Sequence, residues 1–109
     1  PSSSTHNISG MKRITDLDDS LKPKILNESI IDEIFEVENN KAYRMGIKLA
    51  RKNGILVGPS TGAILSAVLK FAKNNNGLAV MISPDDAYKY ISCYAGFLGL
   101  GDISNKGNR

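Results

Sequence analysis

A short turn in the middle of the chain carries two adjacent hydroxyl side chains between glycines. In residues 58–62, Gly58 and Gly62 enclose Ser60 and Thr61, directly before a stretch with helical spacing. The start of a helix offers unpaired N–H groups and the positive end of the helix dipole, and glycines allow a ligand to approach the backbone. Hydroxyls at this place can contact a ligand or cap the helix. Because capping is the commoner use of Ser and Thr here, spacing alone favours a cap.

The other reactive residue types give no second candidate site. Cys93 and His6 are the only cysteine and histidine of the chain, so the sequence predicts neither an internal disulfide nor a zinc cluster. A reducing, cytoplasmic setting is the default for such a chain. Cys93 lies among apolar residues, which favours a packed thiol over a reactive one. Asp85 and Asp86 have no histidine or third carboxylate nearby, so we interpret them as a helix cap and predict no metal site.

Alternating apolar segments predict the elements that would position the turn. A β-branched and aromatic run at residues 30–37 and fully apolar runs at residues 55–57 and 78–82 indicate strands. Apolar residues at helical spacing in residues 42–52 and 63–71 indicate helices between these strands. Strand, helix, strand, helix, strand with short connections is typical of right-handed βαβ units. The expected fold class is therefore α/β, three-layer, with a mostly parallel sheet and flanking helices.

Punctuating residues suggest where these elements end. Asn53-Gly54 is expected to stop the first helix in the left-handed conformation. A short helix through Tyr90 is expected after Asp85-Asp86. We divide the chain into a loop-rich lead-in at 1–27, an α/β part at 28–92, and a tail at 93–109 that is apolar and then polar. The tail has no obvious cover in this chain, so we expect it to dock on another chain portion or a second subunit; its apolar residues are Tyr94, Phe97, Leu98 and Leu100.

Composition limits the classes of protein to consider. The chain has 109 residues, 41% of them hydrophobic and 23% charged, which is typical of one globular domain. A domain of this size cannot form a deep cleft between two lobes, so a deep active site needs a second domain or chain. The net charge of +3 is spread along the sequence and aromatic residues make up only 6%, which disfavours nucleic-acid binding. No apolar run approaches the roughly 20 residues that span a membrane. The chain starts at Pro1 without Met, and we expect a processed or truncated piece of a longer protein.

Beyond these patterns, the sequence resembles a known enzyme family. Residues 50–63, which include the 58–62 turn, resemble a motif of the pyridoxal-phosphate-dependent cysteine synthase and cystathionine β-synthase family. Further similar stretches occur in the family's order at residues 6–13, 23–26 with 32–34, and 82–85 with 89–92. The resemblance covers nearly all of residues 6–92. It implies the C-terminal portion of such an enzyme, with part of a tryptophan-synthase-β-like fold.

The resemblance also implies roles for the turn residues. Ser60 matches the family serine whose hydroxyl bonds the pyridine nitrogen of pyridoxal phosphate. A neutral hydroxyl cannot hold that nitrogen protonated, so the ring is a weaker electron sink, which suits β-elimination and β-replacement. Gly58 and Gly62 would let the backbone approach the ring edge, and Thr61 would support the turn. Residues 6–10 would line the entrance of the site, although a surface loop is an equal alternative.

Some family features are absent from this chain. In the family, the Schiff-base lysine, the substrate-carboxylate loop and the phosphate loop lie upstream of the matching region, so we assign no catalytic residue here. Residues 86–88 replace a small, glycine-containing stretch, which puts contacts from that loop in doubt.

The resemblance implies a cysteine synthase, which makes cysteine from an O-activated serine and sulfide. The partners it implies are an amino-acid substrate, the missing N-terminal portion and a second copy in a homodimer, with neither nucleic acid nor membrane. Cystathionine β-synthase and a serine or threonine lyase of the same family are the alternatives. A stand-alone, non-catalytic interaction module is a hypothesis of a different class. A phosphate- or nucleotide-binding domain ranks last, because no Gly-x-x-x-x-Gly-Lys-[Ser/Thr] stretch occurs.

Overall fold

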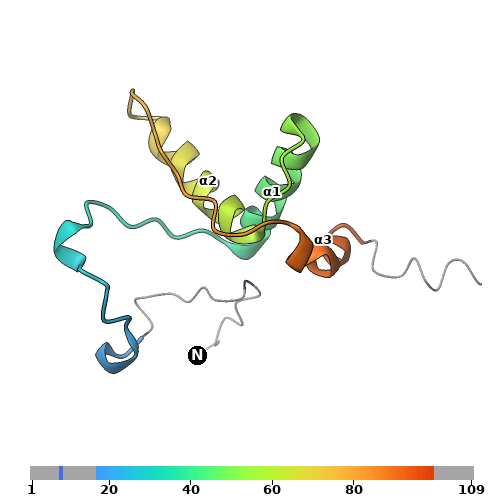
Figure 1. Ribbon diagram of the computed structural model, residues 1–109. Coiled ribbons are helices and arrows are strands. Elements are labelled where there is room, and N and C mark those ends of the chain that lie inside the picture. Colours follow the sequence, from blue (N-terminus) through green and yellow to red (C-terminus); the bar gives the residue numbers. More distant parts are fainter. Residues whose placement is uncertain (1–7, 9–16, 100–109) are drawn as a thin grey trace, which may run out of the picture. The chain divides into compact units, whose positions relative to one another are not determined.

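The chain divides into two units, Pro1–Glu36 and Val37–Arg109. The computed structural model describes residue 8 and residues 17–99 of the chain (Figure 1). Among these residues, the first unit contains two short 3-10 turns, and the second contains three α-helices and a third 3-10 turn. The 58–62 turn belongs to the second unit.

In the described part of the first unit, Lys22 forms local ion pairs. Its 3-10 turns are η2 (Asp19–Leu21) and η3 (Glu28–Ile30). The Lys22 ammonium lies 3.1 Å from a carboxylate oxygen of Asp19 and 3.4 Å from one of Glu28. Hydrogen bonds to Asp19 and then Glu28 raise the pKa of Lys22. Exposed ion pairs of this kind add little stability, so they fix local geometry rather than a core.

Helix α1 (Asn39–Asn53) confirms the helix predicted over 42–52. It ends at Gly54, which has φ 66° and whose N–H donates to the Ala50 carbonyl at 2.9 Å. The left-handed stop expected at Asn53-Gly54 is therefore present, and glycine takes this conformation without steric cost.

Helix α2 (Pro59–Ala72) starts earlier than expected. The sequence placed residues 58–62 in a turn before a helix at 63–71, whereas Pro59 is already the first helical residue and Gly58 is the N-cap. Proline is well suited to the first helical position, because its fixed φ matches the helix and its missing N–H would have no intrahelical partner there. Ser60, Thr61 and Gly62 consequently form the first turn of α2.

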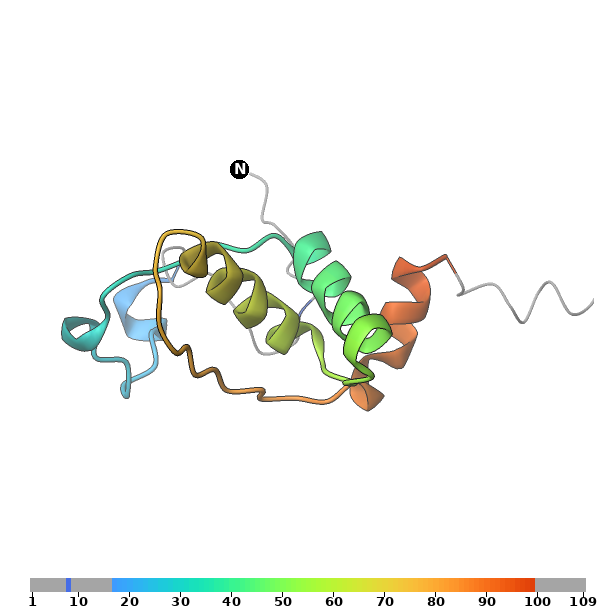
Figure 2. The ribbon, with the colours of Figure 1, turned by 90° about the horizontal axis from the view of Figure 1, so that it is seen from above.

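The two long helices cross through small residues near their N-termini, and they diverge from that point (Figures 1 and 2). A side chain on Gly62 would run into the backbone carbonyl of Ala42, so the two backbones are in direct contact. Ser66 donates from its hydroxyl to the Gly62 carbonyl at 2.8 Å, which satisfies a polar group inside the contact. Ala42 and Ala63 are 0% and 5% exposed. The centre of the second unit is therefore a close helix crossing.

Helix α3 (Ile91–Phe97) was not expected, since it lies largely in the segment assigned to the tail. It follows the 3-10 turn η4 (Tyr88–Tyr90) and packs on α1. The ring of Tyr43 meets Tyr94 edge-on at 5.4 Å and stacks on Phe97 at 5.8 Å between centroids.

The expectation that the apolar tail has no cover within this chain is therefore wrong for Tyr94 and Phe97. Leu98 is 40% exposed, and Leu100 lies outside the described residues. No helix in the described part of the chain is long and apolar enough to cross a membrane.

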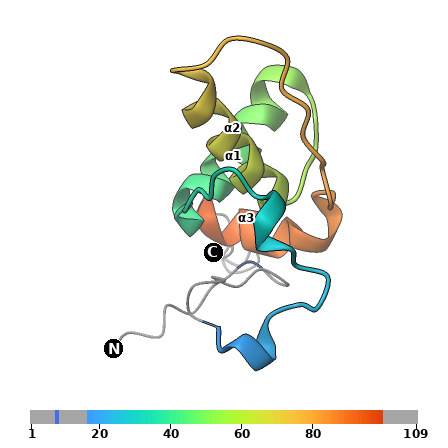
Figure 3. The same ribbon diagram turned by 90° about the vertical axis from the view of Figure 1, so that its left-hand side faces the viewer.

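The predicted α/β fold class, with its three layers and mostly parallel sheet, is wrong for this structure. The described residues are helical and form no sheet, and β pairing is limited to one antiparallel bridge between Val57 and Asp86. Residues 78–82 are extended, as Figure 3 shows along the path from α2 to α3, but they pair with no strand. Leu78 and Val80 are 94% and 86% exposed. A strand is stabilised by a neighbouring backbone, which an apolar run cannot supply by itself.

Candidate functional site

The predicted site residues lie where the start of α2 meets the segment after residue 82. The Gly58 N–H donates to the Asp85 carbonyl at 3.2 Å, beside the bridge between Val57 and Asp86. These contacts join parts of the chain that are more than twenty residues apart in sequence. They fix the entry into α2 and therefore the direction of its first side chains.

Thr61 is almost completely buried, and its hydroxyl has hydrogen-bond partners within the chain. It is 1% exposed, and its hydroxyl donates to a carboxylate oxygen of Asp85 at 3.3 Å. The Ser83 hydroxyl lies 2.8 Å from the same oxygen of Thr61. Either hydroxyl can donate in this bond, and the Ser83 hydroxyl also donates to the Asp85 carbonyl at 3.5 Å. Ser83, Thr61 and Asp85 form a hydrogen-bonded chain that leaves Thr61 no proton for a ligand.

Ser60 differs from its neighbour in this respect. The residue is 8% exposed, yet no described residue makes a hydrogen bond to its hydroxyl. It stands at the second position of α2, beside the unpaired N–H groups of the helix start. Of the two hydroxyls predicted for the site, Ser60 is the one with hydrogen-bonding capacity left for a small molecule.

The two glycines of the turn face protein atoms. A Cβ on Gly58 would overlap the Asp85 carboxylate, and a Cβ on Gly62 would overlap the Ala42 carbonyl. Gly62 therefore needs glycine for packing within this chain, because its obstacle is backbone, whereas the obstacle at Gly58 is the end of a side chain that can move. The prediction that both glycines also border a cofactor ring remains a prediction.

Tyr94 supports the turn from α3 and was missed in the sequence as a site residue. Its hydroxyl donates to the Val57 carbonyl at 2.9 Å, one residue before Gly58. Burial, followed by the negative charge of Asp85, raises its pKa to about 12, so the phenol keeps its proton at ordinary pH. Gly46 makes room for this hydroxyl, because a Cβ there would collide with it. No local pattern in the sequence indicates this contact, since it depends on the unexpected helix α3.

The structure separates the two aspartates that sequence analysis treated together as a cap. Asp86 does act locally, because its side chain accepts a hydrogen bond from the Tyr88 N–H at 2.9 Å just before η4. Asp85 instead contacts Thr61 and borders Gly58. Asp85 was therefore undervalued by the sequence interpretation.

Two other predictions have different outcomes. Cys93 is exposed, so the expectation of a packed thiol is wrong. The expected entrance loop at residues 6–10 lies outside the described residues except for Ile8, which is buried.

Comparison with known proteins indicates the family of the chain. No family model matches the sequence. The chain is 37% identical over 92 residues to a cysteine synthase of Aquifex aeolicus (strain VF5), which covers 80% of this chain and 27% of that protein. It is 39% identical over 72 residues to a probable cysteine synthase of Bacillus subtilis (strain 168), covering 64% of this chain and 23% of that protein.

A relative with a different name matches as well. The cystathionine beta-synthase of Apis mellifera is 32% identical over 94 residues, or 84% of this chain and 19% of that protein. The chain belongs to the cysteine synthase and cystathionine β-synthase family, which confirms the resemblance found in the sequence. It spans about a quarter or less of the length of these relatives.

Proposed function

We propose that this chain is the C-terminal portion of a pyridoxal-phosphate-dependent β-replacement enzyme, a cysteine synthase that makes cysteine from an O-activated serine and sulfide. Support comes from relatives named cysteine synthase that match 80%, 64% and 76% of the chain. A cytoplasmic setting and a homodimer, both expected from the sequence analysis, belong to the same proposal.

The observation that carries the proposal is the contrast between Ser60 and Thr61. Ser60 has a hydroxyl without a partner among the described residues, while Thr61 is held by Ser83 and Asp85. A pyridine nitrogen needs one hydrogen-bonding group at a fixed place. The Ser60 hydroxyl fits this need, because the Thr61 network and the crossing at Gly62 fix the backbone on its C-terminal side.

The cofactor would supply an electron sink for removing the α-proton and the β-substituent of the amino acid. This chain would hold the nitrogen end of the ring through Ser60 and enclose that end with the start of α2. A serine hydroxyl is neutral and far less acidic than a pyridinium ion, so it leaves the nitrogen unprotonated. Such a ring stabilises negative charge moderately, which favours loss of a β-leaving group over other reactions of amino acids.

Cystathionine β-synthase activity is the alternative, and it has its own support. Relatives of that name match the chain, including an O-acetylserine dependent cystathionine beta-synthase of Bacillus subtilis (strain 168) that is 38% identical over 72 residues. The two activities differ in the sulfur nucleophile, which is sulfide in one and homocysteine in the other. Supplying the full-length protein with O-acetylserine and each nucleophile separately, and quantifying cysteine and cystathionine, distinguishes them.

Ser60→Asp in the full-length protein tests the role of Ser60. A carboxylate beside the ring nitrogen favours its protonation, so the absorption spectrum of the bound cofactor should shift and β-replacement should fall by about tenfold or more. Ser60→Ala should weaken cofactor binding without the spectral shift. The matched control is Ser92→Asp, which places the same charge at an exposed serine of α3. Unchanged spectra and rates in Ser60→Asp would remove Ser60 from the site.

A further inference from the structure

Helix α1 has a strongly basic face, although its cationic residues are interspersed with other residues in the sequence. The helix has five cationic residues and no acidic one between Asn39 and Asn53. At 3.6 residues per turn, these five side chains fall within an arc of about 100° on the helix surface. The cationic residues are Lys41, Arg44, Lys48, Arg51 and Lys52. The opposite side of α1 carries the buried Ala42 and Gly46 that face α2.

The cations of this face are exposed in the described part of the chain and form no ion pair there. All five are exposed. The ion pairs found within the described residues involve Lys22 in the first unit, and none involves α1. Outside α1 the chain carries more acidic than basic residues, so the helix concentrates positive charge that the net value of +3 understates. Charge gathered in this way attracts an oppositely charged partner and orients it.

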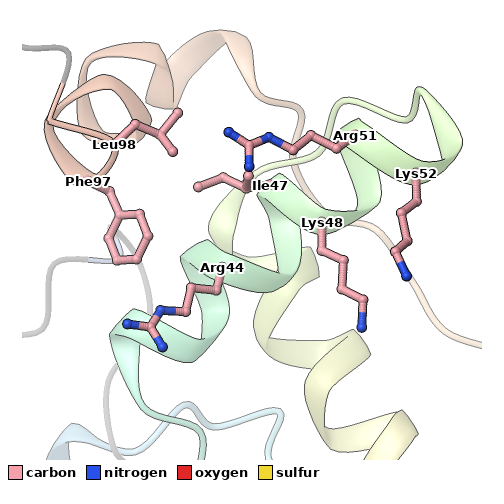
Figure 4. Close-up of a pocket in the computed structure, with 7 residues that line it drawn as sticks. All are labelled: Arg44, Ile47, Lys48, Arg51, Lys52, Phe97 and Leu98. Carbon is pink, nitrogen blue, oxygen red and sulfur yellow. The ribbon is translucent and has the colours of Figure 1, made fainter.

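A pocket opens along the basic face, and four cations of that face are among the residues that line it. It has a volume of about 320 Å³, and it lies between α1 and the end of α3 (Figure 4). Ile47, Phe97 and Leu98 supply its apolar lining, and Arg44 and Arg51 flank them in the close-up, while Lys48 and Lys52 extend from another side of α1. The pocket thus combines space for a bulky apolar group with guanidinium groups at its rim.

The combination indicates the chemistry of the occupant. Guanidinium groups bind carboxylates with paired hydrogen bonds, and interfaces between proteins favour arginine and aromatic residues around an apolar centre. A nucleic acid would supply phosphates and bases, but stacking on Phe97 is restricted because its ring already stacks on Tyr43. We propose that this pocket binds an acidic segment of another protein, with a large apolar side chain inserted between carboxylates that pair with Arg44 and Arg51.

A binding experiment on the full-length protein tests this surface. The probe is a fluorescein-labelled peptide, Glu-Glu-Phe-Glu-Glu, followed by fluorescence anisotropy at about 0.15 M ionic strength, where only nearby charges remain effective. The wild type should bind it, and the double variant Arg44→Glu/Arg51→Glu should weaken the affinity by about tenfold or more. Arg44→Gln/Arg51→Gln should give a smaller loss in the same direction. Both arginines are exposed, so the variants should retain the circular dichroism spectrum of the wild type.

Controls separate this proposal from general attraction of anions. Lys24→Glu/Lys89→Glu changes the net charge equally at exposed residues outside α1 and should leave the affinity unchanged within about twofold. A peptide with serine in place of phenylalanine should bind more weakly, since it leaves the pocket empty. Equal binding of the serine peptide, absence of any binding, or tighter binding of a short oligothymidylate with the same dependence on Arg44 and Arg51 would each overturn the proposal.

Discussion

Replacing Gly62 with alanine tests whether the backbones of α1 and α2 are in direct contact where the helices cross. In a helix this substitution ordinarily stabilises, because alanine is the better helix former by about 1 kcal/mol. Here the added Cβ would overlap the carbonyl oxygen of Ala42, which is a backbone atom and has no rotamer to change. The helices must therefore separate, and the contacts of the buried Ala63 and Ser66 loosen with them.

The expected loss follows from these opposing effects. Forcing an extra methyl group into a packed interior costs about 1–3 kcal/mol, and a rigid obstacle places Gly62 near the upper end. Subtracting part of the helix-propensity gain leaves a net destabilisation of about 2 kcal/mol. The loss should appear without any cofactor, since the obstacle belongs to the chain itself.

Urea unfolding followed by circular dichroism measures this change. Gly96→Ala is the matched control, because Gly96 also lies in a helix but has no atom near its Cβ position. It should leave the free energy of unfolding unchanged or raise it by up to about 1 kcal/mol. The reasoning is refuted if Gly62→Ala unfolds at the same urea concentration as the wild type or a higher one, with an unchanged slope.

Two further substitutions probe the support of the turn. Thr61→Val keeps the shape of a buried side chain but removes its bonds to Ser83 and Asp85, and should lower the free energy of unfolding by about 2 kcal/mol in urea titrations. Tyr94→Phe removes the bond to Val57 and should cost about 1 kcal/mol near neutral pH. Because the fold raises the pKa of Tyr94 from 10.0 to about 12, the stabilisation from its protonated form is present below pH 10 and is lost as pH rises toward 12. The free energy of unfolding, measured across that range, should fall less steeply for Tyr94→Phe than for the wild type, and equal slopes would contradict this.

The two long helices, α1 and α2, were predictable because their signals are local. The spacing of apolar residues in 42–52 and the Asn53-Gly54 stop are contained in the helix itself, and both are confirmed. The start of α2 also has a local signal in Pro59, but the glycines of residues 58–62 led to the prediction of a turn there. Helix α3 was missed because Gly96 is a poor helix former, although Ile91 and Tyr94 have helical spacing.

The sheet failed as a prediction because its stability is not local. The apolar runs 55–57 and 78–82 indicate only that these residues favour burial. Pairing needs a second extended backbone at the correct distance and register, and the described residues provide it at one point, between Val57 and Asp86. A pattern read from one segment cannot report whether that neighbour exists.

The same distinction between local signals and long-range contacts applies to the candidate site. Ser60 and Thr61 are identifiable from their place at a helix start, but only the fold distinguishes them, since Asp85 approaches Thr61 from twenty-four residues away. The basic face of α1 also depends on the fold, because its five cations are separated in sequence and the helix brings them onto one face. Each case depends on geometry that converts separation in sequence into proximity. The residues whose roles were misjudged, Asp85 and Tyr94, are accordingly those whose partners lie far along the chain.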